Sequence, residues 1–176
     1  MSQWFMLTLV GQDQPGIVAK VTTALYTAGC NLGEASMLRL GGNFTMMLMV
    51  NSPDSAFNIN PLIDPIAKEL QLHYHFDPIT GQLHDHPEAE IRISIHGADR
   101  VGIVAQVTTV LAEMGFNILN LESDVGGNPQ QPFYIMHIEG TCTQGIETLK
   151  IVLDQLISTR LSDLYVQVAA IDLAVM

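Results

Sequence analysis

The chain has 176 residues, seven basic and 18 acidic side chains, and a formal net charge of −11. Its Lys and Arg residues stand singly among carboxylates, so the clustered cations that nucleic acid or an anionic membrane requires are missing. No apolar run approaches the roughly 18 residues of a bilayer span, and the first residues lack the basic start of a signal peptide. Two cysteines in an otherwise unstapled chain suggest free thiols in a reducing compartment. We therefore expect a cytoplasmic protein that binds neither nucleic acid nor membrane.

The first half of the chain alternates extended and helical patterns. Apolar residues at helical spacing between Asp13 and Gly29 predict a helix, with Asp13 as its N-cap and Pro15 near its first position. Gly41-Gly42 predicts a two-residue hairpin turn, and Pro65 is expected to kink the second helix or to mark its first turn. The other predicted elements are strands at 4–10, 35–40, 44–50 and 72–76 and a helix over 60–70.

The second half predicts the same order of elements after a polar linker punctuated by Pro and Gly. Strands are expected at 91–96, 116–125, 133–139 and 165–171, and helices at 103–114 and 144–161, with a longer hairpin loop at 126–132. Both halves follow the order βαββαβ, the ferredoxin-like arrangement. We predict an α+β fold with two such domains in tandem, at 1–77 and 91–176, joined by a linker at 78–90. Each domain is expected to have an antiparallel sheet with its helices on one face.

An internal repeat indicates that the two halves arose by duplication. The segment from Gly11 to Asn31 recurs 86 residues later, from Gly97 to Asn117, and 12 of the 21 aligned residues are identical without a gap. Two unrelated segments rarely agree so well, and the period is far too long for a solenoid repeat. The repeat covers the junction between the first strand and the first helix of each predicted domain.

This repeated junction is the best candidate for a binding site. Each copy joins an aspartate, a glycine that lets a ligand approach the backbone, and the free N–H groups of a helix N-terminus, which attract a carboxylate. Asn31 and Asn117 follow the same helices and offer amide groups to a small polar ligand. The alternative is purely structural: Asp13 and Asp99 cap the helices, the glycines turn the chain, and the asparagines end the helices.

The pattern Asp-x-Pro-Gly-Ile-Val-Ala, followed by a helix that ends in Gly-x-Asn inside a βαββαβ unit, resembles the ACT domain. ACT domains are regulatory modules that bind amino acids, usually at this loop and at interfaces between paired domains. The resemblance implies ligand-binding residues in both units: Asp13, Gln14, Pro15, Gly16, Ile17 and Asn31 in the first, and Asp99, Arg100, Gly102, Ile103 and Asn117 in the second. Val101 stands where the family has proline, so the second loop departs from the pattern.

Two such domains without a catalytic domain are similar to transcriptional regulators, which implies a non-enzymatic amino-acid sensor that acts through a regulatory protein partner. The implied ligand is a small amino acid such as glycine or serine, with no cofactor. The acidic chain favours contact with a DNA-binding protein over contact with DNA itself. The alternative function is that of a regulatory subunit of an amino-acid or one-carbon metabolic enzyme. No nucleophile elbow, phosphate loop or dinucleotide fingerprint calls for catalysis.

A histidine-rich stretch offers a competing metal hypothesis. His73, His75, His84 and His86 lie within 14 residues, and neutral imidazole binds zinc or nickel. His73 and His75 are expected to share one face of a strand. The spacing fits no known zinc motif, so solvated histidines are the favoured interpretation and we expect no metal site.

The predicted sheets leave edge strands that must be paired or covered. Met37, Met46, Met47 and Met49 are expected in the core or at an interface, because methionine fills irregular gaps. Together these features predict a homodimer.

Overall fold

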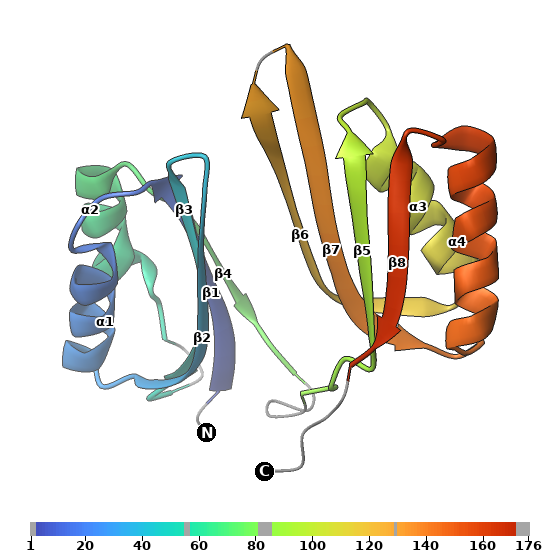
Figure 1. The fold of residues 1–176 in the computed structure, drawn as a ribbon. Helices are drawn as coiled ribbons and strands as arrows, with labels where there is room; N and C mark the ends of the chain where they lie inside the picture. The colour runs from blue at the N-terminus through green and yellow to red at the C-terminus, as the bar shows by residue number, and fades with distance from the viewer. Residues whose placement is uncertain (1–2, 55–56, 81–85, 129, 172–176) are drawn as a thin grey trace. The chain divides into compact units, whose positions relative to one another are not determined.

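The computed structural model describes residues 3–54, 57–80, 86–128 and 130–171. The chain forms two compact units that divide between residues 84 and 85, and each unit has the element order βαββαβ (Figure 1). Both sheets are four-stranded and antiparallel, with two helices on one face. The predicted tandem ferredoxin-like fold is therefore confirmed. No helix in the described ranges is long and apolar enough to cross a bilayer.

The first unit consists of β1 (Gln3–Gln12), α1 (Ile17–Thr27), β2 (Asn31–Leu40), β3 (Asn43–Ser52), α2 (Asn60–Leu70) and β4 (His73–Pro78). Its strand order is β2-β3-β1-β4, so β1 and β3 are the central strands. Alternate residues of β1, including Leu7 and Leu9, are fully buried in the core that the helices cover. Ile17, Val21 and Leu25 form the buried stripe of α1, one helical turn apart.

The second unit consists of β5 (Ile91–Ala98), α3 (Ile103–Glu113), β6 (Phe116–Asn128), β7 (Gln131–Cys142), α4 (Ile146–Arg160) and β8 (Leu164–Ala170). Its strand order, β6-β7-β5-β8, repeats that of the first unit. Ile93 and Ile95 of β5 are fully buried, and so are Val107 and Leu111 of α3. The same alternation of strand residues and the same helical stripe therefore build both cores.

The two β-hairpins differ in how far the prediction holds. Gly41 and Gly42 both have positive φ, at 55° and 78°, as expected for a two-residue turn between β2 and β3. The loop predicted at 126–132 is wrong, because β6 and β7 extend into it. Antiparallel pairing continues from Gly126 opposite Phe133 to Asn128 opposite Gln131. The ladder of backbone hydrogen bonds outweighs the weak strand propensity of glycine and asparagine there.

Helix α2 has the predicted bounds, Asn60–Leu70, but Pro65 does not mark its start. Pro61 occupies the first turn, where a missing N–H group removes no helical hydrogen bond. Pro65 lies inside the helix with its ring exposed, and the chain remains helical on both sides of it.

Candidate functional site: two equivalent strand-to-helix loops

The candidate site is the loop that joins the first strand of each unit to its first helix. In the first unit it spans residues 13–16, between β1 and α1, and in the second it spans 99–102, between β5 and α3. Gly16 and Gly102 end these loops with almost the same left-handed backbone, at φ 93° and 91°. An L-residue with a side chain pays roughly 1–2 kcal/mol for that conformation, which explains the glycine in both copies.

The structure contradicts the expectation that Asp13 caps α1. The N-cap position belongs to Gly16 in α1 and to Gly102 in α3, and neither helix has a side-chain cap. Asp13 instead forms an ion pair with Arg39 of β2, at 2.7 Å between Oδ2 and Nε, and its backbone N–H donates to the carbonyl of Gly42 at 3.1 Å. The N-cap residue, Gly16, comes three residues after Asp13, so the aspartate lies too early in the chain to cap the helix. The first-turn N–H groups of both helices are therefore left without a side-chain acceptor.

Gln14 and Arg100 occupy the same loop position and make the same kind of contact. Gln14 donates from Nε2 to the carbonyl oxygen of Leu70, the last residue of α2, at 2.8 Å. Arg100 donates from Nη2 to the carbonyl oxygen of Arg160, the last residue of α4, at 2.8 Å. Arg100 also pairs with Asp163, at 2.9 Å from Nη1 to Oδ1. Each side chain thus fastens its loop to the C-terminal end of the second helix.

A cavity of about 280 Å³ opens beside the first loop. Four of the six residues predicted for this site line the cavity, together with two further residues of α1, one residue of β2 and one residue of β3. The lining residues are Asp13, Gln14, Gly16, Ile17, Val18, Ala19, Met37 and Phe44. Ile17 and Phe44 are buried and form an apolar wall, while the Asp13 carboxylate is about a quarter exposed. The cavity therefore combines a carboxylate, an uncapped helix N-terminus and an apolar surface.

The second loop has the same backbone but different side chains. Val101, where the first loop has Pro15, is 99% exposed, so it neither rigidifies the loop nor packs against the unit. Asp99 is exposed, and its backbone N–H donates to the carbonyl of Pro132 at 3.4 Å. Ile103 is buried like Ile17 and anchors the first turn of its helix. The loop predicted to depart from the family pattern does differ in its exposed surface.

The two predicted asparagines lie at the opposite end of their sheets. Asn31 begins β2 and is level with Asn51, whereas Asp13 follows the other end of β1, where Gln12 faces Asn43. Eight residues of strand separate these levels, or roughly 26 Å. Asn117 has the equivalent place at the start of β6, opposite Thr141. A single unit therefore does not bring its asparagine to its own loop.

The histidine cluster is only partly within the described chain. His73 and His75 are both exposed on β4, on the face away from the helices, so the expectation that they share a face is confirmed. His84 lies outside the described residues. Among the residues that are described, no group of three or more His, Cys, Asp or Glu side chains is arranged to hold a metal ion.

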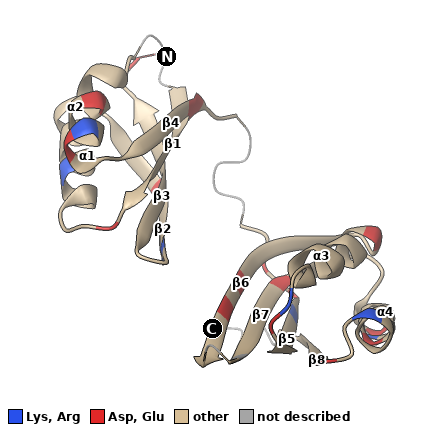
Figure 2. Ribbon diagram, turned by 90° about the horizontal axis from the view of Figure 1, so that it is seen from above, with Lys and Arg blue, Asp and Glu red and all other residues tan. Residues whose placement is uncertain are grey.

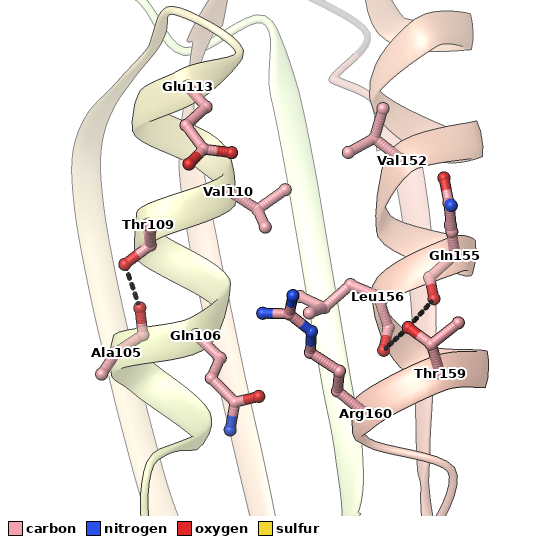
Figure 3. A pocket seen from close by; sticks show the side chains of 10 residues that line it. All are labelled: Ala105, Gln106, Thr109, Val110, Glu113, Val152, Gln155, Leu156, Thr159 and Arg160. Carbon is pink, nitrogen blue, oxygen red and sulfur yellow. Dashed lines mark hydrogen bonds between the residues drawn. The ribbon is translucent and has the colours of Figure 1, made fainter.

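A second kind of hollow, which the sequence did not predict, lies between the two helices of each unit. In the second unit it measures about 390 Å³, and Figure 3 shows the Arg160 guanidinium reaching across it toward Gln106 on α3. Its lining residues are Ala105, Gln106, Thr109, Val110, Glu113, Val152, Gln155, Leu156, Thr159 and Arg160. In the first unit the equivalent groove is crossed by the ion pair of Lys20 with Glu69. Such a groove depends on how two helices pack, which sequence spacing alone does not reveal.

Comparison with known proteins supports the ACT resemblance in both units. Residues 3–77 and 91–158 each match the ACT domain family. The glycine cleavage system transcriptional repressor of Escherichia coli (strain K12) is 23% identical over 139 residues, which cover 78% of this chain and 73% of that protein. UPF0237 protein YjhC of Lactococcus lactis is 42% identical over 82 residues, or 45% of this chain and 94% of that protein. A crystal structure of an unknown protein from Galdieria sulphuraria shares the fold over 97% of this chain and 99% of that one, with a TM-score of 0.77 and 22% identity.

The fold and its two equivalent loops define a protein of tandem ferredoxin-like units, each with a glycine-ended loop before its first helix. The chain belongs to the ACT domain family and contains two ACT domains in tandem. It is a regulatory ACT-domain protein related to the glycine cleavage system transcriptional repressor.

Proposed function

We propose that this protein is a non-enzymatic sensor of a small amino acid, such as glycine or serine, which binds in the cavity beside the first loop. The observation that carries the proposal is the cavity itself, where the Asp13 carboxylate and the uncapped start of α1 line one hollow. No cofactor is required for such binding.

The chemistry of this cavity suits a zwitterion. The first-turn N–H groups and the positive end of the α1 dipole favour a carboxylate. The Asp13 carboxylate, already oriented by Arg39, accepts an ammonium group. Met37 and Phe44 line the cavity with apolar surface and favour a ligand with a short side chain. The hydrogen bond from Gln14 to Leu70 holds the loop in place just before this turn, and the ring of Pro15 restricts the backbone next to it.

The second loop is the weaker candidate. Asp99, Gly102 and Ile103 repeat the first loop, but Asp99 is exposed and Val101, which is 99% exposed, replaces proline. Asn31 and Asn117 lie at the far end of their own sheets, so neither contributes to the loop of its own unit. We therefore assign the principal ligand site to the first loop.

We further propose that the protein acts in the cytoplasm as a transcriptional regulator of the glycine cleavage system type, through a protein partner. The name of the Escherichia coli relative supports this assignment. The net charge of −11 and the isolated Lys and Arg residues disfavour direct contact with DNA (Figure 2). The alternative is a regulatory subunit of an amino-acid or one-carbon metabolic enzyme, which would change the activity of one co-purified enzyme.

A titration calorimetry screen against the twenty amino acids tests ligand binding. We expect glycine or serine to bind, Asp13→Asn to abolish binding, and the matched variant Asp99→Asn to retain it. Arg39→Gln removes the ion pair but keeps the carboxylate, so it should weaken binding less than Asp13→Asn. If no amino acid binds the wild-type chain, the sensor proposal is wrong. Salt-sensitive binding of the purified protein to duplex DNA would overturn the partner-mediated mechanism.

A further inference from the structure

The groove between α3 and α4 of the second unit carries two opposite charges. Arg160, the last residue of α4, reaches across the groove toward Gln106, and Glu113, the last residue of α3, lines the groove further along (Figure 3). Both charged side chains are exposed, and in the described ranges neither the guanidinium nor the carboxylate forms an ion pair or a hydrogen bond. Each group is therefore free to bind a ligand.

The first unit has an equivalent groove, which an ion pair crosses. The residues that line it have counterparts 86 residues later in the second groove, the same offset that relates the two loops. They are Ala19, Lys20, Thr23, Ala24 and Ile66, which correspond to Ala105, Gln106, Thr109, Val110 and Val152. Lys20 pairs with Glu69 across the first groove. Two neutral amides, Gln106 and Gln155, hold these positions in the second groove, so the ion pair is missing there.

The two charges of the second groove have no charged counterpart in the first. Thr27 is the counterpart of Glu113. Helix α2 ends at Leu70, whose counterpart is Leu156, whereas α4 continues for a further turn and ends at Arg160. The same pair of helices thus packs without either charge in the first unit. The fold therefore does not require these charges, and a bound molecule explains them.

The separation of the charges sets the length of that molecule. The Arg160 guanidinium points toward Gln106, which lies seven residues before Glu113 on α3. Seven residues are about two helical turns, or roughly 10 Å along the groove. Hydrogen bonds of about 2.9 Å at both ends, inclined to the helix axis, leave roughly 5–8 Å between the end groups of the ligand.

The surface between the charges suits a chain of methylene groups. Val110 and Val152 are half-buried and Leu156 is buried, so the floor of the groove is apolar. The hydroxyls of Thr109 and Thr159 both donate to carbonyls of their own helices at 2.7 Å. Those two polar side chains therefore need no hydrogen bond from the ligand.

We propose that the groove between α3 and α4 binds a linear ω-amino acid, a molecule with a carboxylate at one end and an ammonium at the other. Arg160 binds the carboxylate, for which the guanidinium offers two parallel N–H donors. Glu113 accepts the ammonium, and the methylene chain lies on the valines between them. A ligand without net charge is not repelled by a chain of charge −11, as an anion is. Glycine and serine are too short to join the two ends.

NMR titration of the full chain with ω-amino acids of increasing length tests the proposal. The series is β-alanine, γ-aminobutyrate, δ-aminovalerate and ε-aminocaproate. We expect amide shifts at Val110 and Val152, with an affinity that rises about fourfold for each added methylene as far as δ-aminovalerate. Glutarate and cadaverine have similar lengths but like charges at both ends, so each should bind about tenfold more weakly or worse.

Charge-removing variants show whether the groove is the site. Arg160→Gln and Glu113→Gln should each weaken the binding of δ-aminovalerate by about tenfold or more. Lys150→Gln and Glu147→Gln are the matched controls, because they remove an ion pair of α4 that does not line the groove. Both controls should bind as the wild type does. Circular dichroism establishes that every variant is folded.

An exchange of the two charges separates binding from a structural role. Arg160→Glu alone should not bind δ-aminovalerate, whereas Arg160→Glu combined with Glu113→Arg should bind it again in the reverse orientation. The proposal is overturned if no member of the series binds at about 50 mM, if glutarate or cadaverine binds equally well, if the controls lose as much affinity as the groove variants, or if the folded exchange variant does not bind. None of these ligands carries an ammonium beside its carboxylate, so failure here leaves the proposed sensor site untouched.

Discussion

Replacing Arg100 by alanine removes two contacts that hold the second loop against the end of α4. The ion pair with Asp163 joins side chains that are 38% and 45% exposed, so it contributes about 0–1 kcal/mol. The hydrogen bond to the carbonyl of Arg160 contributes about 1 kcal/mol, helped by the negative end of the helix dipole. We expect Arg100→Ala to lower the free energy of unfolding of the second unit by about 1–2 kcal/mol.

Differential scanning calorimetry is a suitable assay, because the two units can unfold in separate transitions. In a unit of roughly 90 residues, each kcal/mol lowers Tm by about 4–8 °C. Arg100→Gln can keep the bond to the helix end, as Gln14 does in the first unit, and should recover about half of the loss. In 1 M salt the difference between Arg100→Gln and wild type should shrink, because only the ion pair is screened.

Gln14→Ala provides the matched comparison in the first unit. It removes a neutral hydrogen bond, so we expect a loss of about 1 kcal/mol that does not depend on salt. The reasoning is refuted if Arg100→Ala leaves both transitions unchanged. It is also refuted if the loss in Arg100→Ala persists in full at 1 M salt while Arg100→Gln behaves as wild type.

Three further predictions concern backbone packing and pH. Gly97→Ala should lower the free energy of unfolding in urea by more than about 3 kcal/mol, because the added Cβ would lie 2.3 Å from the backbone oxygen of Asp163. In Gly11→Ala the added Cβ meets mainly the end of a side chain, which can move, so the loss should be about 1–2 kcal/mol. Equal losses in the two variants would contradict this reasoning. Desolvation and a hydrogen bond to the Asp64 carboxylate raise the pKa of Tyr74 to about 12, so the unfolded chain loses this proton at a lower pH than the folded chain. The free energy of unfolding of the wild-type protein should therefore fall between about pH 10 and 12, and it should fall less in Tyr74→Phe. Burial raises the pKa of the Cys30 thiol, so a disulfide reagent at pH 7 should modify it far more slowly in the native protein than in urea; equal rates would be inconsistent with a buried thiol.

The sequence was sufficient for the fold because its main signals are local. Ile17, Val21 and Leu25 are one helical turn apart, and this spacing alone predicts the buried stripe of α1. The bounds of α2 were correct for the same reason. The end of β6 was missed because glycine and asparagine usually mark loops, while the partner strand that keeps them extended lies elsewhere in the chain.

The details of the candidate site depend on partners that are distant in sequence. Asp13 was expected to cap a helix, since its aspartate precedes one, but Arg39 lies 26 residues further along and captures the carboxylate. Gln14 was assigned to a ligand, although its amide is already engaged by Leu70. The far position of Asn31 follows from strand register, which no local pattern contains. The composition of the loop was predictable, but the geometry around it was not.

The bond from Gln14 to the last carbonyl of α2 also makes the loop and that helix end thermodynamically linked. Any ligand that draws Gln14 toward itself must break a contact of about 1 kcal/mol and so frees the final turn of α2. By reciprocity, a protein that binds and orders this helix end changes the ligand affinity of the loop by the same factor, up to about fivefold. A small molecule bound at the loop can therefore affect the C-terminal end of α2, which leads directly into β4. This effect requires no change in the sheet.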